Sequence, residues 1–255
     1  MRIISFNANG LRSAQRKGFF PWFVRQKADV LCVQELKAHA HQIEDRAFHA
    51  RGFHRFLHCA EKPGYSGVAL YVKKEPVNVV YGYGNPEFDA EGRYVEVEFD
   101  DLIVASAYFP SGSSSEARQE AKFRFLPTFE DYMRGKLESG KPYVVSGDVN
   151  IAHKQIDLKN WRSNKKNSGF TPEERAWMDH LIDDVGFVDA FRVADTSADQ
   201  YTWWSNRGRA WEKNVGWRID YQLITPSLRE RVQSASIYKR KRFSDHAPLI
   251  IDYDD

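Results

Sequence analysis

Short polar clusters mark the ends of the apolar segments in this chain, and this pattern constrains its fold more than any other feature. The segments have the length and the β-branched residues that are typical of buried strands. Polar residues where such strands end point to one edge of a sheet, so we expect the clusters to share a rim. They comprise Asn7, Asn9, Glu35, Tyr108, Asp148, Asn150, Asp220, Asp245 and His246. Acids, amides and one histidine at a shared rim are typical of a metal site that binds phosphate.

Strand segments outnumber helical segments along the sequence. We expect strands at residues 1–7, 29–35, 66–74, 93–99, 102–109, 143–150, 218–225, 235–239 and 247–253. We expect helices at residues 13–26, 39–50, 116–138 and 172–185. Many strands with a few long helices predict an α/β fold with two facing mixed sheets and helices packed outside them. No linker, repeat or low-complexity tract divides the sequence, so we expect one domain over residues 1–255.

Two of the expected helices have clear N-terminal signals. Ser113–Ser115 are capping candidates for the helix at residues 116–138, whose apolar stripe belongs to the core. Thr171–Glu174 combine an N-cap residue, a proline at the first helical position and an acidic first turn. We interpret these segments as scaffold rather than as parts of a site.

The composition is that of a protein with an ordinary hydrophobic core. Hydrophobic residues make up 42% of the chain and aromatic residues 14%, which suffices for a core without disulfides or structural metals. The two cysteines fit a reduced compartment, and Cys32, inside an apolar run, is interpreted as a core residue. The N-terminus has a strand pattern rather than a leader, and no segment has the apolar length of a membrane span. We therefore expect a soluble, cytoplasmic protein without membrane contact.

The net charge of +2 conceals local clusters of basic residues. Lys239–Arg242 directly precede the polar cluster at residues 244–246, and Arg207, Arg209 and Lys213 lie in another polar segment. Basic clusters beside a site suggest a polyanionic substrate. Each cluster alone is equally consistent with solvated loop charge.

Glu35 closes an otherwise apolar run, where an ionised carboxylate is costly without a cation or hydrogen bonds. A metal ion is the simplest partner, with Asn7, Asn9 and Asp245 as further oxygen ligands. Such ligands suit Mg²⁺, with Mn²⁺ as a substitute, and the sequence has no Cys/His set with the spacing of a zinc site. The alternative is a structural glutamate paired with arginine.

Asp148 and Asn150 follow an apolar strand two residues apart, so an extended backbone places them on the same side. Asp148 is then suited to orient or deprotonate a water molecule. Asn150 is suited to donate its amide hydrogen to a phosphate oxygen or to hold the nucleophile. The same four residues, Gly147–Asn150, also fit a β-turn.

His246 lies between an acid and a strand. If Asp220 reaches one ring nitrogen, the imidazole is oriented and its charged form is favoured. A positive imidazolium stabilises the charge that develops on a scissile phosphate. Activated water needs only positioning and charge neutralisation, so no serine or cysteine nucleophile is required.

The order of short motifs along the chain is recognisable. The motifs are SFNANGLR, VQELK, GVALY, YFPSG, GDVNIAH, IDLKN, NKKNSGFTPEER, NVGWRIDY and SDHAPL. Together, from Ile3 to Asp252, they closely resemble the exonuclease III type of AP endonuclease, in the exonuclease-endonuclease-phosphatase superfamily. This resemblance implies a four-layer α/β sandwich, in agreement with the two facing sheets and outer helices expected above.

The resemblance also implies a role for each residue of the polar clusters. Glu35 matches the principal Mg²⁺ ligand, and Asn7, Asn9 and Asp245 line the same end of the site. Asp148 matches the residue that prepares the attacking water, with Asn150 as its partner, and Tyr108 matches a tyrosine that contacts the phosphate. His246 and Asp220 match the oriented imidazole pair. If a second ion takes part, its ligands would be Asp148, Asn150 and His246.

DNA contacts are implied in the same way. Asn164 and Asn167 match positions that bind the DNA backbone. Trp203, Trp217 and Ile219 match an apolar pocket that receives a flipped-out abasic sugar, which is small and costs little to extrude. Core packing is the alternative role for these apolar side chains.

The chain departs from the family pattern at several positions. Ser111–Ser114 replace a polar inserting set of some members, which leaves wedge contacts from that loop in doubt. Arg207 stands where other members have an apolar inserting residue, and with Arg209 and Trp211 it is expected to probe the duplex instead. Asn9 replaces an aspartate of some relatives, which weakens the local negative charge.

These observations predict a Mg²⁺-dependent DNA repair endonuclease. It would cleave the phosphodiester 5′ to an abasic site in double-stranded DNA and leave a 3′-hydroxyl. The family adds 3′-phosphodiesterase and 3′-5′ exonuclease activity on blocked 3′ ends. We expect a monomer. The alternatives are a phosphoesterase acting on lipid or phosphoinositide and a non-catalytic DNA-binding module that kept the fold.

Overall fold

Two six-stranded sheets form the centre of the molecule, in a computed structural model that describes residues 1–254. The first sheet has the order β13-β14-β1-β2-β4-β3, with strands Val232–Ile237, Leu249–Tyr253, Arg2–Asn7, Val30–Gln34, Val68–Val72 and His54–His58. The second has the order β5-β6-β7-β8-β12-β9, with strands Asn78–Tyr81, Tyr94–Glu98, Ile103–Tyr108, Tyr143–Asp148, Asp220–Ile224 and Val188–Asp189. Strands β1 and β2 are parallel, as are β7 and β8, and their neighbours pair antiparallel, so both sheets are mixed.

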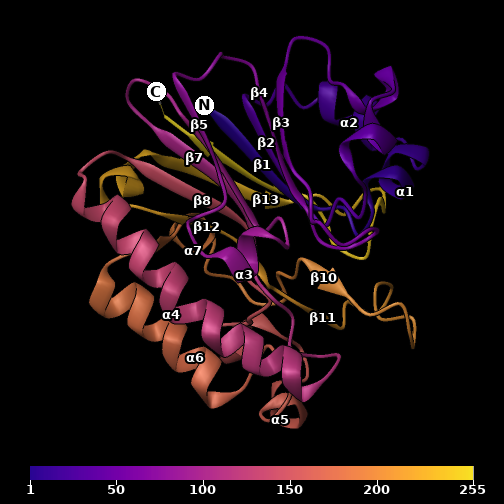
Figure 1. Cartoon of the computed structure of the whole chain (residues 1–255). Helices are drawn as coiled ribbons and strands as arrows, with labels where there is room; N and C mark the ends of the chain where they lie inside the picture. Colours follow the sequence, from indigo (N-terminus) through magenta and orange to yellow (C-terminus); the bar gives the residue numbers. More distant parts are fainter. Residues whose placement is uncertain (255) are drawn as a thin grey trace.

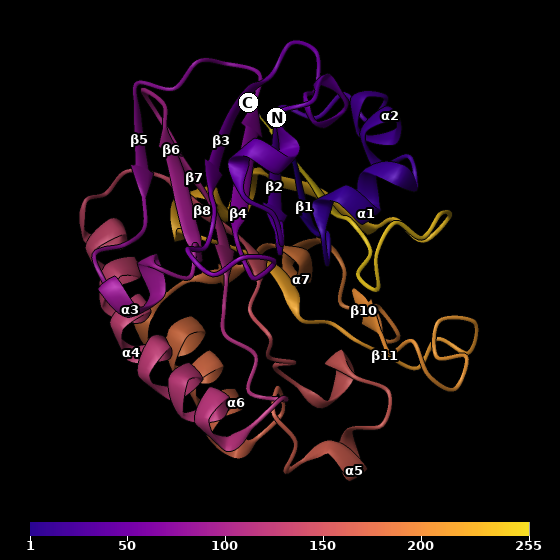
Figure 2. The same ribbon diagram turned by 45° about the vertical axis from the view of Figure 1, so that its right-hand side comes forward.

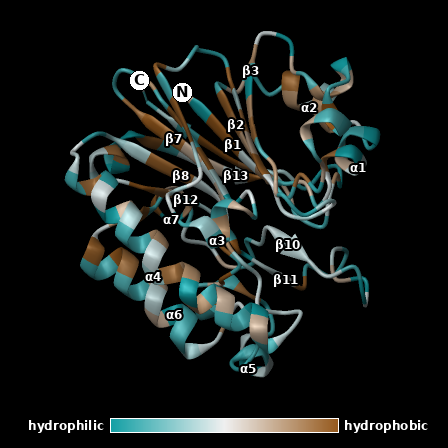
Figure 3. Cartoon of the chain, in the orientation of Figure 1, coloured by the Kyte–Doolittle hydropathy of each residue, from teal (hydrophilic) through white to brown (hydrophobic). Residues whose placement is uncertain are grey.

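The sheets face each other and helices cover their outer faces (Figures 1 and 2). Apolar residues of both sheets fill the space between them, among them Ile3, Val68, Leu249, Val104, Val144 and Ile224. Helices α1 (Leu11–Arg16) and α2 (Phe19–Val24) cover the first sheet, and α4 (Glu116–Glu138) and α6 (Pro172–Asp179) cover the second. Figure 3 shows the apolar, brown colouring on the strands of both sheets and mostly teal loops. The predicted four-layer α/β sandwich is confirmed.

The prediction of a single helix at residues 13–26 is wrong. The chain forms α1 and α2, separated at Gly18, whose φ of 85° lies in the left-handed region. Glycine adopts this conformation without the steric cost that a Cβ brings, and it interrupts the helical hydrogen bonds. The helix therefore breaks there and turns Phe19 and Phe23 into the core.

Residues 39–50 form no continuous helix, which corrects a second prediction. Two short 3₁₀ helices, η1 (Ala40–Ile43) and η2 (Arg46–Phe48), occupy the segment. The Gln42 side chain accepts from the His39 N–H, and the Asp45 side chain accepts from the Ala47 N–H. Side chains that bond to nearby backbone in this way compete with a continuous helix.

The other two helix predictions agree with the structure. Helix α4 has the predicted bounds, and its N-cap Ser115 accepts from the Arg118 N–H. Helix α6 begins after the predicted N-cap, Thr171, which forms a capping box with Glu174, and it continues as a π-helical segment, η4 (His180–Val185), which ends before Gly186.

Most predicted strands match within two residues, but the strand expected at 235–239 lies earlier, as β13. Elements that the sequence did not predict are short or lie at sheet edges. They are β3, β5, β9, the hairpin strands β10 (Trp203–Trp204) and β11 (Gly216–Trp217), helices α3 (Pro86–Asp89), α5 (Trp161–Asn164) and α7 (Ala190–Ala194), and the 3₁₀ segments η3 (Gln155–Asp157) and η5 (Pro226–Arg231).

A buried hydrogen-bond chain ties the two sheets together close to the polar rim. The Gln34 amide donates to Ser106 Oγ at 3.0 Å, and Ser106 Oγ donates to the Val33 carbonyl at 3.0 Å. Buried polar groups with satisfied hydrogen bonds hold a fixed geometry. The chain thus fixes Glu35, at the end of β2, relative to Tyr108, at the end of β7.

Over residues 1–254, none of the helices combines the length and the hydropathy that crossing a membrane requires.

Candidate active site

The strand pairing brings the polar clusters to one rim. Asn7 ends β1 beside Gln34 of β2, so Glu35 follows directly. Tyr108 and Asp220 both lie opposite Asp148, across the β7·β8 and β12·β8 pairs. Residues 245 and 246 precede β14, whose Leu249 pairs with Ser5 near the end of β1. Six separate stretches of the sequence therefore meet at the same end of the two sheets.

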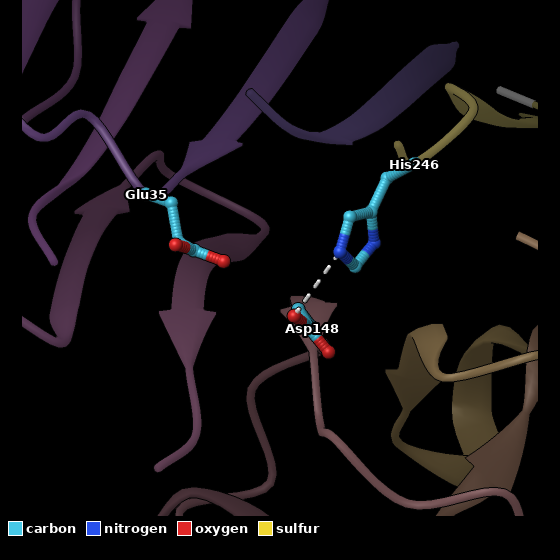
Figure 4. A group of neighbouring side chains, drawn as sticks. All are labelled: Glu35, Asp148 and His246. Carbon is cyan, nitrogen blue, oxygen red and sulfur yellow. Dashed lines mark ion pairs between the residues drawn. The ribbon is translucent and has the colours of Figure 1, made fainter. Parts of the chain in front are cut away.

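Glu35, Asp148 and His246 form the centre of this rim. One carboxylate oxygen from each acid and one ring nitrogen of the histidine lie within 4.8 Å of one another. His246 Nε2 is 3.8 Å from Asp148 Oδ2. Figure 4 shows the three side chains pointing toward one another from three separate segments. Two carboxylates and an imidazole at this separation can hold a divalent cation.

Asn7 connects the two acids. Its amide group donates to Glu35 Oε1 and to Asp148 Oδ2, both at 2.8 Å, and its carbonyl oxygen accepts from the Asn9 N–H at 2.9 Å. Asn7 is fully buried, and its donors hold two like charges in place. Its observed role is to orient the carboxylates.

Asn9 and Asp245 form a second corner, on the side of the first sheet. The Asn9 amide donates to Asp245 Oδ1 at 2.9 Å, and Trp203 Nε1 donates to Asp245 Oδ2 at 3.1 Å. Lys37 reaches the same corner, where its ammonium lies 2.8 Å from Glu35 Oε2 and donates to Asn9 Oδ1 at 2.5 Å. Glu35 is thus paired with lysine, whereas the structural alternative considered from the sequence was arginine.

Asp220 and His246 form a buried pair. His246 Nδ1 lies 2.9 Å from Asp220 Oδ2, and both residues are almost fully buried. Burial alone would lower the pKa of His246, but the carboxylates of Asp220 and Asp148 raise it above the usual range. The imidazole therefore stays protonated at neutral pH and directs Nε2 toward Asp148.

Asp148 and Asn150 lie together, but in a turn rather than on an extended segment. Strand β8 ends at Asp148, the Asn150 N–H donates to Asp148 Oδ1 at 2.9 Å, and Asn150 has a left-handed φ of 56°. Asparagine tolerates this conformation better than most residues. The Asn150 amide donates to the Phe109 carbonyl at 3.0 Å and to Asp148 Oδ2 at 3.3 Å, which leaves its carbonyl oxygen for a ligand.

Burial raises the pKa of Asp148, and the nearby carboxylates of Asp220 and Glu35 raise it further, while His246 opposes them. The rim holds four carboxyl groups, those of Glu35, Asp148, Asp220 and Asp245, against two cations, Lys37 and the protonated His246. A bound divalent cation would supply the missing positive charge.

Tyr108 lies beside Glu35 with its ring under the Arg93 guanidinium, 4.9 Å from the ring centroid. Burial raises the pKa of Tyr108 well above its usual range, and the Glu35 carboxylate adds to this. The phenol therefore stays protonated and serves as a hydrogen-bond donor.

A cavity of about 340 Å³ opens beside the three central residues. Its lining comprises Glu35, Tyr108, Ser111, Ser113, Asp148, Asn150, Asn164, Asn167, Ser168, Gly169, Trp203, Trp217, Ile219, Asp245 and His246. The two tryptophan rings meet edge to face, with centroids 6.4 Å apart. The Asn167 amide donates to Asn164 Oδ1 at 2.8 Å, so these two side chains are fixed as a pair. The cavity thus has one acidic wall, one apolar wall and one wall of amides.

Arg207 lies outside the cavity lining, on the exposed loop between β10 and β11. Trp211, which was also expected to probe the duplex, lies on the same loop and packs against Trp204 of β10, with ring centroids 4.4 Å apart. Packing of this kind rigidifies the loop from inside.

Sequence reasoning missed Lys37, Lys122 and Glu174. Lys122 is fully buried in α4, and its ammonium donates to the backbone carbonyl of Asn150 at 2.7 Å and to Glu174 Oε1 at 2.6 Å. Glu174 Oε2 accepts from the N–H groups of Gly169 and Thr171 at 2.7 and 3.0 Å. One sequence signal could have indicated Lys122, because it lies next to Ala121 in the apolar stripe of α4. A lysine buried at such a position needs a partner of opposite charge.

Comparison with known proteins agrees with this geometry. The model of the Endonuclease/Exonuclease/phosphatase family matches residues 4–246. The chain belongs to this family. It is 38% identical over 251 residues to an exodeoxyribonuclease of Bacillus subtilis, covering 98% of each chain. It is also 38% identical to the DNA repair nuclease APEX1 of Danio rerio, covering 98% of this chain and 81% of the relative.

Among solved structures, an AP endonuclease from Archaeoglobus fulgidus superposes with a TM-score of 0.91 at 28% identity, and all of both chains is covered. The resemblance to the exonuclease III type of AP endonuclease is thus confirmed, and the chain is a hydrolase, a nuclease of that type.

Proposed function

We propose that this nuclease hydrolyses the phosphodiester on the 5′ side of an abasic site in duplex DNA and leaves a 3′-hydroxyl. We also propose that it removes blocking groups from 3′ ends, as a 3′-phosphodiesterase or 3′-5′ exonuclease. The strongest support is that one cavity is lined both by the central residues Glu35, Asp148 and His246 and by an apolar wall. Relatives named as a DNA repair nuclease and as an exodeoxyribonuclease support DNA as the substrate.

We propose Mg²⁺ as the cofactor, with Mn²⁺ as a substitute. The donor set fits a hard cation because it offers carboxylate and amide oxygens with a single imidazole. Glu35 is the principal ligand, with Asn7, Asn9 and Asp245 as the supporting polar groups at the same end of the site. If a second ion takes part, its ligands would be Asp148, Asn150 and His246, and His246 would then bind in its neutral form. When bound, such an ion neutralises the phosphate and the departing oxygen.

The chain's own residues prepare the water and bind the phosphate. Asp148 accepts a proton from the attacking water, and the side-chain carbonyl oxygen of Asn150, Oδ1, holds that water in line. The protonated imidazole of His246 and the phenol of Tyr108 donate to the phosphate oxygens, where negative charge develops. Asp220 acts through His246 by keeping its ring oriented and charged.

The apolar wall selects the substrate. Trp203, Trp217 and Ile219 line one wall of the cavity, and they would receive the base-free sugar there and favour it over an intact nucleotide. Asn164 and Asn167 bind the adjoining backbone phosphate. Arg207, outside the cavity, contacts the duplex beyond the lesion.

We propose that residues 1–255 act as one catalytic unit and as a monomer. Size-exclusion chromatography with light scattering tests the oligomeric state.

The test is an assay on duplexes that carry either an internal abasic site or a blocked 3′ end. Incision is expected 5′ to the lesion, with loss of activity to background in EDTA and recovery on addition of Mg²⁺. Turnover of a phospholipid or phosphoinositide with none on abasic DNA would refute the proposal, as would incision that persists in EDTA.

Replacing Asp220 by asparagine is expected to lower kcat by about 10²-fold with little change in KM, because the imidazole loses its charge partner and its orientation. Single-turnover rates on the abasic duplex measure this. D179N is a matched control, since Asp179 also bonds a histidine, His153, at 2.7 Å but lies outside the cavity lining. Equal rates for D220N and D179N would remove Asp220 from the mechanism.

A further inference from the structure

Trp203 offers two different groups to the site, its apolar ring and its indole N–H. The ring lines the cavity and meets the ring of Trp217 edge to face. The N–H, at the edge of the ring, donates to Asp245 Oδ2 at 3.1 Å. Tryptophan can do both at once, because its ring system is apolar and still carries one hydrogen-bond donor. Phenylalanine at this position would supply the ring alone.

The backbone of Trp203 is held from both sides, so the edge of the indole has a fixed position. On one side strand β10 pairs with β11. On the other side Trp203 lies opposite His246 in an isolated bridge, and the Trp204 N–H donates to the Asp245 carbonyl oxygen at 3.1 Å. The indole N–H is therefore built against the segment that carries Asp245.

The Asp245 carboxylate takes its position from three donors. Its Oδ1 accepts from the Asn9 amide at 2.9 Å and from Ser244 Oγ at 3.1 Å, and its Oδ2 accepts from the Trp203 indole. A carboxylate oxygen can accept two hydrogen bonds, so Oδ2 retains one acceptor site. Because Asp245 lines the cavity, the Trp203 bond sets how this oxygen is presented to a ligand there.

Asp245 lies just outside the three central residues. It lines the same cavity, but it does not belong to the group of three whose ligand atoms lie within 4.8 Å of one another. Its partner Asn9 is linked to Glu35 by Lys37, whose ammonium contacts Glu35 Oε2 and donates to Asn9 Oδ1. A cation held by Glu35 has this corner as its neighbour, and groups placed just outside the ligands of a metal set how tightly it is held.

We propose that the indole N–H of Trp203 positions Asp245 for the cation, so that Trp203 contributes to ion binding as well as to the sugar pocket. This inference rests on the proposed function and adds to Trp203 a role that its ring cannot supply. Trp203 is a positioning residue for the ion, since it acts through Asp245. Ion and sugar then influence each other through one side chain, and an effect of this kind on binding is reciprocal.

The experiment measures ion binding by the DNA-free protein, which separates this role from contacts to the sugar. Titration calorimetry with Mn²⁺ alone compares the parent, W203F and W217F. W203F keeps an aromatic ring and loses the N–H. W217F is the matched control, because Trp217 lines the same wall but is not among the donors to Asp245. We expect W203F to bind Mn²⁺ about 10-fold more weakly than the parent and W217F to stay within about twofold of it.

A second replacement separates the N–H from the volume of the ring. 3-Benzothienylalanine at position 203 has sulfur in place of the indole N–H and keeps the shape of the two rings. It should lower the affinity for Mn²⁺ as much as W203F does, and it provides the test should W203F fold poorly. If it binds Mn²⁺ as tightly as the parent, the N–H has no part in ion binding and the inference is overturned.

Incision of the abasic duplex gives an independent readout. The Mg²⁺ concentration for half-maximal incision should rise about 10-fold in W203F. In W217F we expect KM for the duplex to change while the Mg²⁺ requirement stays that of the parent. An equal Mg²⁺ requirement in W203F and W217F would contradict the assignment.

The failure of this inference and the failure of the proposed function have different signatures. Equal Mn²⁺ affinity of W203F and the parent, or an equal loss in W203F and W217F, overturns the inference even when the parent incises abasic DNA. If the parent binds Mn²⁺ but incises no abasic DNA, the proposed function fails, and the calorimetry still decides the role of Trp203. If the parent binds no Mn²⁺, both fail.

Discussion

Replacing Asp148 by asparagine is expected to lower turnover of an abasic duplex by about 10³-fold while DNA affinity stays within a few-fold. Asparagine keeps the shape of the side chain, but it cannot accept the proton of the attacking water and brings no negative charge to the rim. Incision with enzyme in excess measures the chemical step. A binding titration in EDTA measures affinity separately.

Protein stability distinguishes this effect from misfolding. Burial, and after it the carboxylates of Asp220 and Glu35, raise the pKa of Asp148, so a neutral side chain is favoured at this position in the ion-free protein. D148N should therefore be at least as stable as the parent in EDTA. D252N is a control at the far end of the sheet, where Asp252 pairs with Arg2. Near-normal incision by D148N would rule out Asp148 as the group that prepares the water.

The architecture could be predicted from the sequence because the central strands are buried on both faces. Strands of this kind consist of nearly continuous apolar residues, which are easily recognised. All residues of β2, β4, β7 and β8 are buried. Edge strands have a weaker pattern, and β3, with the sequence HRFLH, is only half-buried. Its pairing with β4, rather than its own composition, makes it a strand.

Local backbone geometry accounts for most of the errors. The helix expected at 13–26 overlooked the left-handed conformation of Gly18, and the one at 39–50 overlooked side-chain bonds to the backbone. At the rim, Glu35 and Asn150 themselves adopt left-handed φ values of 52° and 56°. Strain of this kind, stored at a functional site, has no signature in hydrophobic periodicity.

The candidate site could be predicted from the sequence because its residues lie at strand ends, and the sheet topology alone brings them together. The residues that support the site from below could not be predicted in this way. Lys122 and Glu174 lie in two helices that are far apart in sequence, and each has an ordinary local role, as a helix residue or a capping residue. Only the tertiary contact between α4 and α6 shows that they form a buried ion pair beneath Asn150.

Replacing Lys122 by methionine is expected to destabilise the protein by about 3 to 5 kcal/mol, because it leaves the Glu174 carboxylate buried without its cation. Both side chains are fully buried. K122M/E174Q should regain much of that loss, since glutamine carries no charge and can still accept from Gly169 and Thr171. Denaturant unfolding of the parent, both single variants and the double variant gives the coupling energy.

Activity should not recover with stability in K122M/E174Q. The backbone carbonyl of Asn150 still lacks the ammonium that fixes the position of this residue and of its side chain, so we expect kcat to stay lowered by about 10-fold or more while the fold is restored. K136M is the matched control, because Lys136 lies on the same helix and pairs with the buried Glu96 at 2.5 Å, away from the cavity. It should lose stability without losing kcat at temperatures where it is folded. If K122M/E174Q regained both stability and kcat, the Lys122 ammonium would be part of the scaffold alone and would not position Asn150.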